Sequence, residues 1–86
     1  MADSLEKEIR ELRTLFRSER DPDGRVFTPL ADAYRRQGDL VQALELLRDG
    51  LDRHSDFAPA LVVAGWVRRD RGEVDAAREA FGAALE

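Results

Sequence analysis

The sequence predicts an all-α fold, an α-solenoid of two helix–turn–helix repeats preceded by one further helix, five helices in total. The first observation is a glycine that recurs after 34 residues, as Gly38 and Gly72. The second is that small residues recur with it, so that Ala43 falls on Ala77. The third is apolar spacing that favours helices over strands. A unit of this kind cannot bury its apolar face alone, so the pattern indicates a scaffold that presents a surface.

The chain of 86 residues is expected to form one domain. A hydrophobic content of 43% with 37% charged residues is typical of a soluble globular protein. No apolar run approaches the roughly 20 residues that a membrane span requires. The N-terminus is acidic and lacks the apolar core of a secretory signal, so we expect a cytoplasmic protein.

Several classes of site are excluded by composition. The chain has no cysteine and one histidine, which removes disulfides and thiolate chemistry and leaves few zinc ligands. A net charge of −4 argues against a nucleic-acid partner. Lys7 is the one lysine among 14 basic residues. This bias indicates a GC-rich bacterial genome or, alternatively, arginines that make bidentate contacts.

The first helix is expected over residues 3–20. Its apolar residues follow spacings of four, three and four: Leu5, Ile9, Leu12 and Phe16. Asp3 is expected to cap the helix, with Glu6 completing a capping box. The stripe is shorter than coiled coils usually need, so we expect it to pack as a cap on the first repeat. Residues 21–24 are expected to form a turn, and the absence of a following glutamate excludes a calcium loop.

The second helix should end at Gly38, a natural left-handed C-cap. Its start has two alternatives. Thr28 caps it with Pro29 as the first helical residue, or a kinked first turn begins at Arg25. Asp39 should then cap a third helix that runs to about residue 54, with a glutamine three residues on completing the capping box.

The fourth helix is expected to be capped by Ser55 or Asp56, with Pro59 in its first turn, where its missing N–H has no partner to lose. It should end before Gly72. The last helix should span residues 73–85 and is rich in alanine.

The chain resembles the tetratricopeptide repeat family in its motif positions. Residues 24–57 form the first unit and residues 58–86 the second. The matching positions of the first unit are Phe27, Leu30, Ala31, Tyr34, Ala43 and Leu47, and those of the second are Leu61, Ala64, Gly65, Ala77 and Phe81. Arg68 and Ser55 depart from the motif, which prefers Tyr and Pro there. The resemblance implies a right-handed α-solenoid of two repeats with residues 3–20 as its N-terminal cap.

The resemblance also implies a concave groove lined by the first helix of each repeat, which binds a peptide or protein segment. The expected lining residues are Arg25, Thr28, Asp32, Arg35 and Arg36 from the first repeat, and Pro59, Val62, Trp66, Arg69 and Asp70 from the second. Arginines near Trp66 favour an acidic partner, and the indole favours an apolar or aromatic anchor of that partner beside them. Trp66 is interpreted either as an exposed anchor of binding or as a residue covered by the chain's own packing.

We expect no enzymatic activity and no cofactor. The only imidazole, His54, is interpreted as a solvated end-of-helix residue, and no carboxylate pair or phosphate-binding loop is evident. The alternative function is self-association through the last helix. That helix is expected to expose an apolar strip around Ala76, Ala80 and Ala83, which would give a weak homodimer.

Overall fold

The structure is a computed structural model that describes residues 2–19 and 25–86. These residues form five helices and contain no strand, as expected of an all-α fold. The helices are α1 (Ala2–Glu19), α2 (Phe27–Gln37), α3 (Leu40–Arg53), α4 (Ala58–Asp70) and α5 (Val74–Leu85). Within the described ranges, no helix is both long and apolar enough to cross a membrane.

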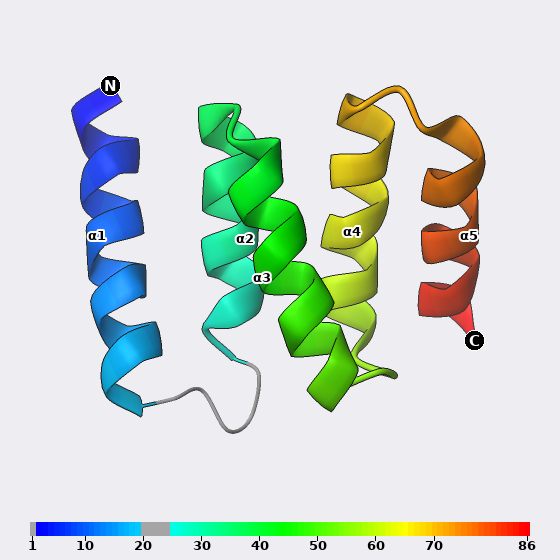
Figure 1. Cartoon of the computed structure of the whole chain (residues 1–86), viewed down its shortest axis with the longest axis horizontal. Coiled ribbons are helices and arrows are strands. Elements are labelled where there is room, and N and C mark those ends of the chain that lie inside the picture. The colour runs from blue at the N-terminus through cyan, green and yellow to red at the C-terminus, as the bar shows by residue number, and fades with distance from the viewer. Residues whose placement is uncertain (1, 20–24) are drawn as a thin grey trace.

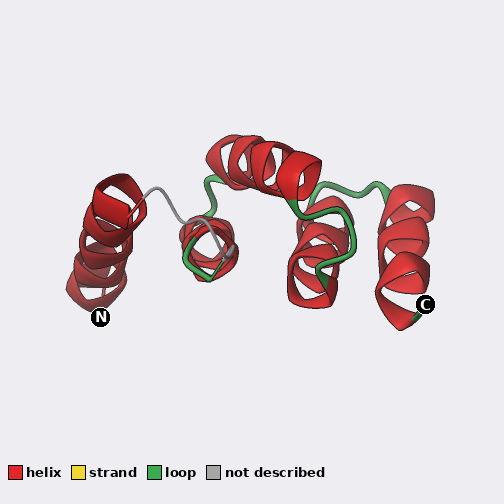
Figure 2. Ribbon diagram, turned by 90° about the horizontal axis from the view of Figure 1, so that it is seen from below, coloured by secondary structure: helices red, strands yellow, loops and turns green. Residues whose placement is uncertain are grey.

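The helices form a row from α1 to α5, with the two ends of the chain at opposite sides (Figure 1). Successive helices run in opposite directions, so α2 and α4 run in the same direction. In Figure 2, α3 lies across α2 and α4 on one side of the row. α2 contacts α3 and α4, whereas α1 contacts α2 alone and α5 contacts α4 alone among these five helices. The direct contact of α2 with α4 creates the candidate site.

Local chemistry explains the helix ends that were predicted correctly. Gly38 and Gly72 adopt left-handed φ angles of 92° and 83°, which glycine reaches without a steric cost. Asp39 caps α3, because its Oδ1 accepts a hydrogen bond of 3.2 Å from the backbone N–H of Gln42.

The predicted starts of α1 and α2 were wrong. α1 begins at Ala2, so Asp3 lies inside the helix, while residue 20 and the turn expected over residues 21–24 lie outside the described residues. α2 begins at Phe27, so Thr28 is its second residue rather than its cap, and Arg25 lies in a turn that precedes the helix. The N–H of Leu30 donates to the carbonyl of Val26, which places the intervening proline in the first turn.

The predicted cap of α4 was also wrong. Phe57 precedes the helix, and its carbonyl accepts hydrogen bonds from the N–H groups of Ala60 and Leu61. The ring of Phe57 lies 6.2 Å from that of Phe27, so aromatic packing positions this helix start instead of a side-chain cap at Ser55 or Asp56. Pro59 does lie in the first turn, as predicted.

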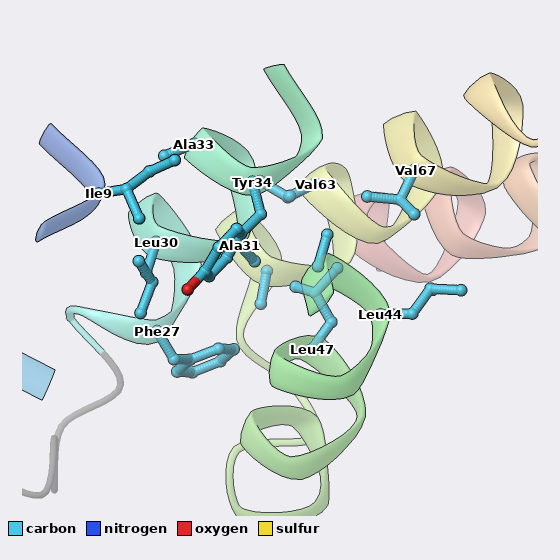
Figure 3. Close-up of a cluster of buried hydrophobic side chains, with 12 residues drawn as sticks. Ile9, Phe27, Leu30, Ala31, Ala33, Tyr34, Leu44, Leu47, Val63 and Val67 are labelled. Atoms are coloured by element: carbon cyan, nitrogen blue, oxygen red, sulfur yellow. The ribbon is translucent and has the colours of Figure 1, made fainter. Parts of the chain in front are cut away.

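A buried cluster joins four of the helices (Figure 3). Its largest fully buried side chains are Phe27, Leu30, Leu47 and Val67. Ile9 brings α1 into this cluster and points toward Ala33 of α2 in Figure 3. Leu12 and Phe16 pack against the same cluster, as the apolar stripe of α1 predicted.

Two glycines allow helices to pack closely against aromatic rings. A Cβ atom at Gly50 of α3 would lie 2.3 Å from the ring of Phe27 in α2. A Cβ atom at Gly65 of α4 would lie 2.4 Å from the ring of Phe81 in α5. Both distances are far below ordinary contact, so each glycine makes room for the ring of the neighbouring helix.

Candidate binding groove between α2 and α4

A groove with a volume of about 370 Å³ lies between α2 and α4. No residue of α3 lines it. The lining residues are Thr28, Pro29 and Asp32 from α2, and Pro59, Val62, Val63 and Trp66 from α4. Helical spacing explains this set, because residues three or four apart in one helix share a face.

The groove is mostly apolar. Val62 and Trp66 are half-buried, and Val63 also belongs to the core cluster. Pro29 and Pro59 are exposed, and neither residue carries a backbone N–H. The groove therefore offers apolar surface with few hydrogen-bond donors.

Thr28 is the one polar residue of the core among the described residues. It is 8% exposed, and its Oγ1 has no hydrogen-bond partner within the described part of the chain. Thr28 was expected to present its side chain to a partner in the groove. Thr28 does line the groove, but it is almost fully buried there and offers a partner little of its surface.

Trp66 is partly covered by the chain's own packing and partly accessible, so each of the two interpretations of this residue holds in part. It packs against the core cluster, and it also lines the groove. The guanidinium carbon of Arg35 lies 5.1 Å from the centroid of its ring, a cation–π contact between α2 and α4. Trp66 is therefore held in place by the chain itself while part of its indole stays accessible.

Arg35 is paired with two carboxylates in addition to this ring. Its Nε donates to Oδ1 of Asp32 at 2.9 Å, and its Nη1 donates to Oδ2 of Asp70 at 3.2 Å. Asp32 belongs to the same helix, whereas Asp70 belongs to α4. One side chain thus connects the two helices that form the groove.

Arg36 extends this network to α1. Its Nη2 donates to Oε1 of Glu8 at 2.9 Å, and its Nε donates to Oδ2 of Asp32 at 3.2 Å. The hydrogen bond to Glu8 is the main reason why the pKa of Arg36 lies above its ordinary value. At the other end, Arg69 lies 3.6 Å from Asp70.

The result is a row of alternating charges across three helices, which we call the charge ladder: Glu8, Arg36, Asp32, Arg35, Asp70 and Arg69.

The structure thus divides the predicted site residues into three groups. Those that line the groove are Thr28, Asp32, Pro59, Val62 and Trp66. Those that belong to the charge ladder beside it are Arg35, Arg36, Arg69 and Asp70, with Asp32 in both sets. Arg25 is exposed, precedes α2 and lines neither feature.

The carboxylate partners that Arg35 and Arg36 have within the chain were not predicted from the sequence. Asp32 lies three and four residues before them on one helix face, which brings its carboxylate to both guanidinium groups. Glu8 adds a second partner for Arg36, because α1 packs beside α2.

Sequence reasoning missed three residues. Pro29 and Val63 line the groove. Helical spacing could have predicted both, because each lies three residues before a predicted lining residue, Asp32 or Trp66, and so shares its helix face. Glu8 of the charge ladder had no such signal, because its position follows from how α1 docks on α2.

No known protein family, curated protein or solved structure significantly matches this chain. The resemblance to tetratricopeptide repeats therefore rests on the residues named above. Among the described residues, no three histidine, aspartate or glutamate side chains form a group that could hold a metal ion.

Proposed function

We propose that this chain is a protein-interaction module that binds a segment of another protein in the groove between α2 and α4. We also propose that α2–α3 and α4–α5 are two tetratricopeptide-like repeats of a right-handed solenoid, with α1 as the N-terminal cap. The observation that carries the proposal is the apolar groove at Trp66. It joins residues from two helices that are about 34 residues apart in the sequence.

Physical considerations favour this groove as the contact surface. Burial of apolar area is the dominant favourable contribution to most protein–protein association. Tryptophan is among the residues that most often dominate binding, because a large ring is buried with little loss of entropy. The groove is also formed without a ligand, since Trp66 is already held by Arg35 and the core. A partner would not have to supply the free energy to order it.

The experiment that tests this proposal is selection of binders from a library of displayed random peptides on the immobilised chain. Trp66 is the only tryptophan of the chain, so its fluorescence then reports binding of a selected tryptophan-free peptide. Val62→Glu places a charge in the groove and should weaken binding at least about tenfold, equivalent to about 1.4 kcal/mol. Val41→Glu is the matched control, because Val41 is an exposed valine of α3 outside the groove.

Two results would count against the groove. The selected peptides would bind Val62→Glu as tightly as the unaltered chain, or Val41→Glu would weaken binding as much as Val62→Glu. Far-UV circular dichroism of both variants confirms that the comparison concerns folded proteins.

Self-association through α5 is a second candidate, and one observation favours it. Among the described helices α5 contacts α4 alone, and it leaves Val74, Ala83 and Leu85 exposed, the last at 89%. The apolar strip is narrower than predicted, because Ala76 and Ala80 are half-buried against the rest of the chain.

Sedimentation equilibrium tests this candidate. A homodimer through α5 predicts that the mean mass rises with concentration and that Ala83→Glu keeps the chain monomeric. A constant monomer mass up to millimolar concentration would remove the candidate.

A further inference from the structure

We infer that the groove receives an uncharged apolar side chain of the partner, and that Arg35 is a positioning residue that holds Trp66 and couples α2 to α4. The inference rests on the proposed function and names the chemical class of its partner. It replaces the acidic partner that the arginines alone predicted.

The charge ladder is electrically balanced within the chain. It contains three carboxylates and three guanidinium groups, and each of them contacts at least one group of opposite sign. Its central members are the least exposed: the side chains of Arg35 and Asp32 are 18% and 24% exposed, against 60% for Arg69 at the end. The part of the ladder nearest the groove is therefore both neutralised and partly shielded from water.

An acidic partner gains little from such a surface. A carboxylate that approached Arg35 would meet a guanidinium whose charge Asp32 and Asp70 already balance, and these two carboxylates would repel it. The attraction would then be small, at the added cost of removing the new charge from water. An apolar side chain has no such cost, and it finds Val62, Trp66 and the two prolines of the groove.

The contacts of Arg35 assign it a positioning role. A guanidinium group can donate hydrogen bonds in its plane and also lie over an aromatic ring. In-plane donors reach Asp32 on its own helix and Asp70 on α4, and the group lies over the ring of Trp66 on α4. Each contact with α4 fixes how far α4 lies from α2 at this end of the groove.

The fluorescence of Trp66 tests the positioning role without any ligand. We expect Arg35→Gln to raise the acrylamide quenching constant of Trp66 by at least about twofold, because the stacked cover is lost. Arg35→Lys should behave similarly, because an ammonium group cannot reach two carboxylates and cover the indole ring at the same time. Arg69→Gln is the matched control and should leave quenching unchanged, because Arg69 pairs with Asp70 while Arg35 is the arginine that lies over the ring. Equal quenching in Arg35→Gln and the unaltered chain, both folded, would overturn the role.

The charge of the partner is tested with the peptides selected from the random library. We expect them to share an aromatic or aliphatic residue without enrichment in Asp or Glu. Their dissociation constant should change less than about threefold between about 0.05 and 0.5 M NaCl, across which charge attraction is strongly screened. Enrichment in acidic residues, with a dissociation constant that rises at least about tenfold over the same range, would overturn the inference.

The two proposals fail in different ways. Peptides that bind Trp66→Ala as tightly as the unaltered chain would refute the groove itself. Peptides that need Trp66 but carry acidic residues and lose affinity in salt would leave the groove standing and refute the uncharged anchor.

Discussion

Gly65 has no side chain because an aromatic ring occupies the space where one would lie. The same holds for Gly50, whereas a Cβ atom at Gly82 would meet no other atom within 4 Å. These three positions are all helical, so their differences come from packing and not from the backbone. Glycine thus allows close helix contact at two positions and has no comparable role at the third.

A pair of substitutions tests this difference. Gly65→Ala should lower the free energy of unfolding by roughly 1–3 kcal/mol, because the ring of Phe81 must move to admit the methyl group. Gly82→Ala adds the same methyl group in open space and should raise stability by up to about 1 kcal/mol, because alanine favours the helix. Urea unfolding followed by circular dichroism measures both. Similar losses in the two variants would contradict the packing argument.

Glu73 provides a pH-dependent test at the same scale. The hydrogen bond from Arg68, at 3.0 Å, is the main cause that holds the pKa of Glu73 below its ordinary value of 4.5. A lowered carboxyl pKa contributes stability above the unfolded pKa and loses it as pH falls through the folded one. We therefore expect the ion pair to stabilise the α4–α5 turn at neutral pH, and to lose this contribution as the pH falls from about 4.5 through the lower pKa of the folded state.

Titration of the Glu73 side chain by NMR measures the effect. In Arg68→Gln the midpoint should move up toward the ordinary value, with a smaller remaining shift from Arg71. A midpoint that is the same with and without Arg68 would contradict the assigned cause.

Residues with local roles were predictable from the sequence. The left-handed Gly38 and the cap at Asp39 depend on their immediate neighbours, and both were predicted correctly. The start of α4 was not, because Phe57 is placed by its contact with Phe27, which lies 30 residues earlier in the sequence.

At the scale of elements, the spacing of apolar residues in α1 determines which face of the helix is buried. Its apolar stripe predicted the face that packs on the rest of the chain, and Ile9 is 4% exposed in the core cluster. The stripe did not predict which charges come into contact with α2. The pairing of Glu8 with Arg36 depends on the position of α1 along α2, and spacing within one helix carries no such information.

Two substitutions of large aliphatic residues by alanine test how much α1 contributes to the stability of the fold. Ile9→Ala should cost about 2–4 kcal/mol of stability, because it leaves a cavity in the cluster that joins α1 to α2. Leu15→Ala is the control on the same helix and should cost clearly less stability, because Leu15 is 45% exposed and lies outside the core cluster. Thermal unfolding measures both. A minor loss in Ile9→Ala would mean that α1 does not stabilise the other helices.

At the scale of the whole molecule, the resemblance to tetratricopeptide repeats implied the most useful relation, that α2 and α4 line one groove, and these two helices are in contact. Asp32, Val62 and Trp66 line the groove between them. The ion pairs beside the groove could not be predicted from the sequence. The sequence shows which side chains are charged but not which of them are in contact. Arg35 is the clearest case. It was expected to contact a ligand, and the structure shows that it contacts Asp32 on its own helix and Asp70 and Trp66 on α4.

The most direct test of the central claim is a map of backbone amide chemical shifts when a selected peptide is added to the ¹⁵N-labelled chain. We expect the largest changes to fall on the groove, at Asp32, Val62, Val63 and Trp66, with the indole N–H of Trp66 among them. Changes that concentrate on the exposed residues of α5, at Val74, Ala83 and Leu85, and leave the groove unaffected would contradict it.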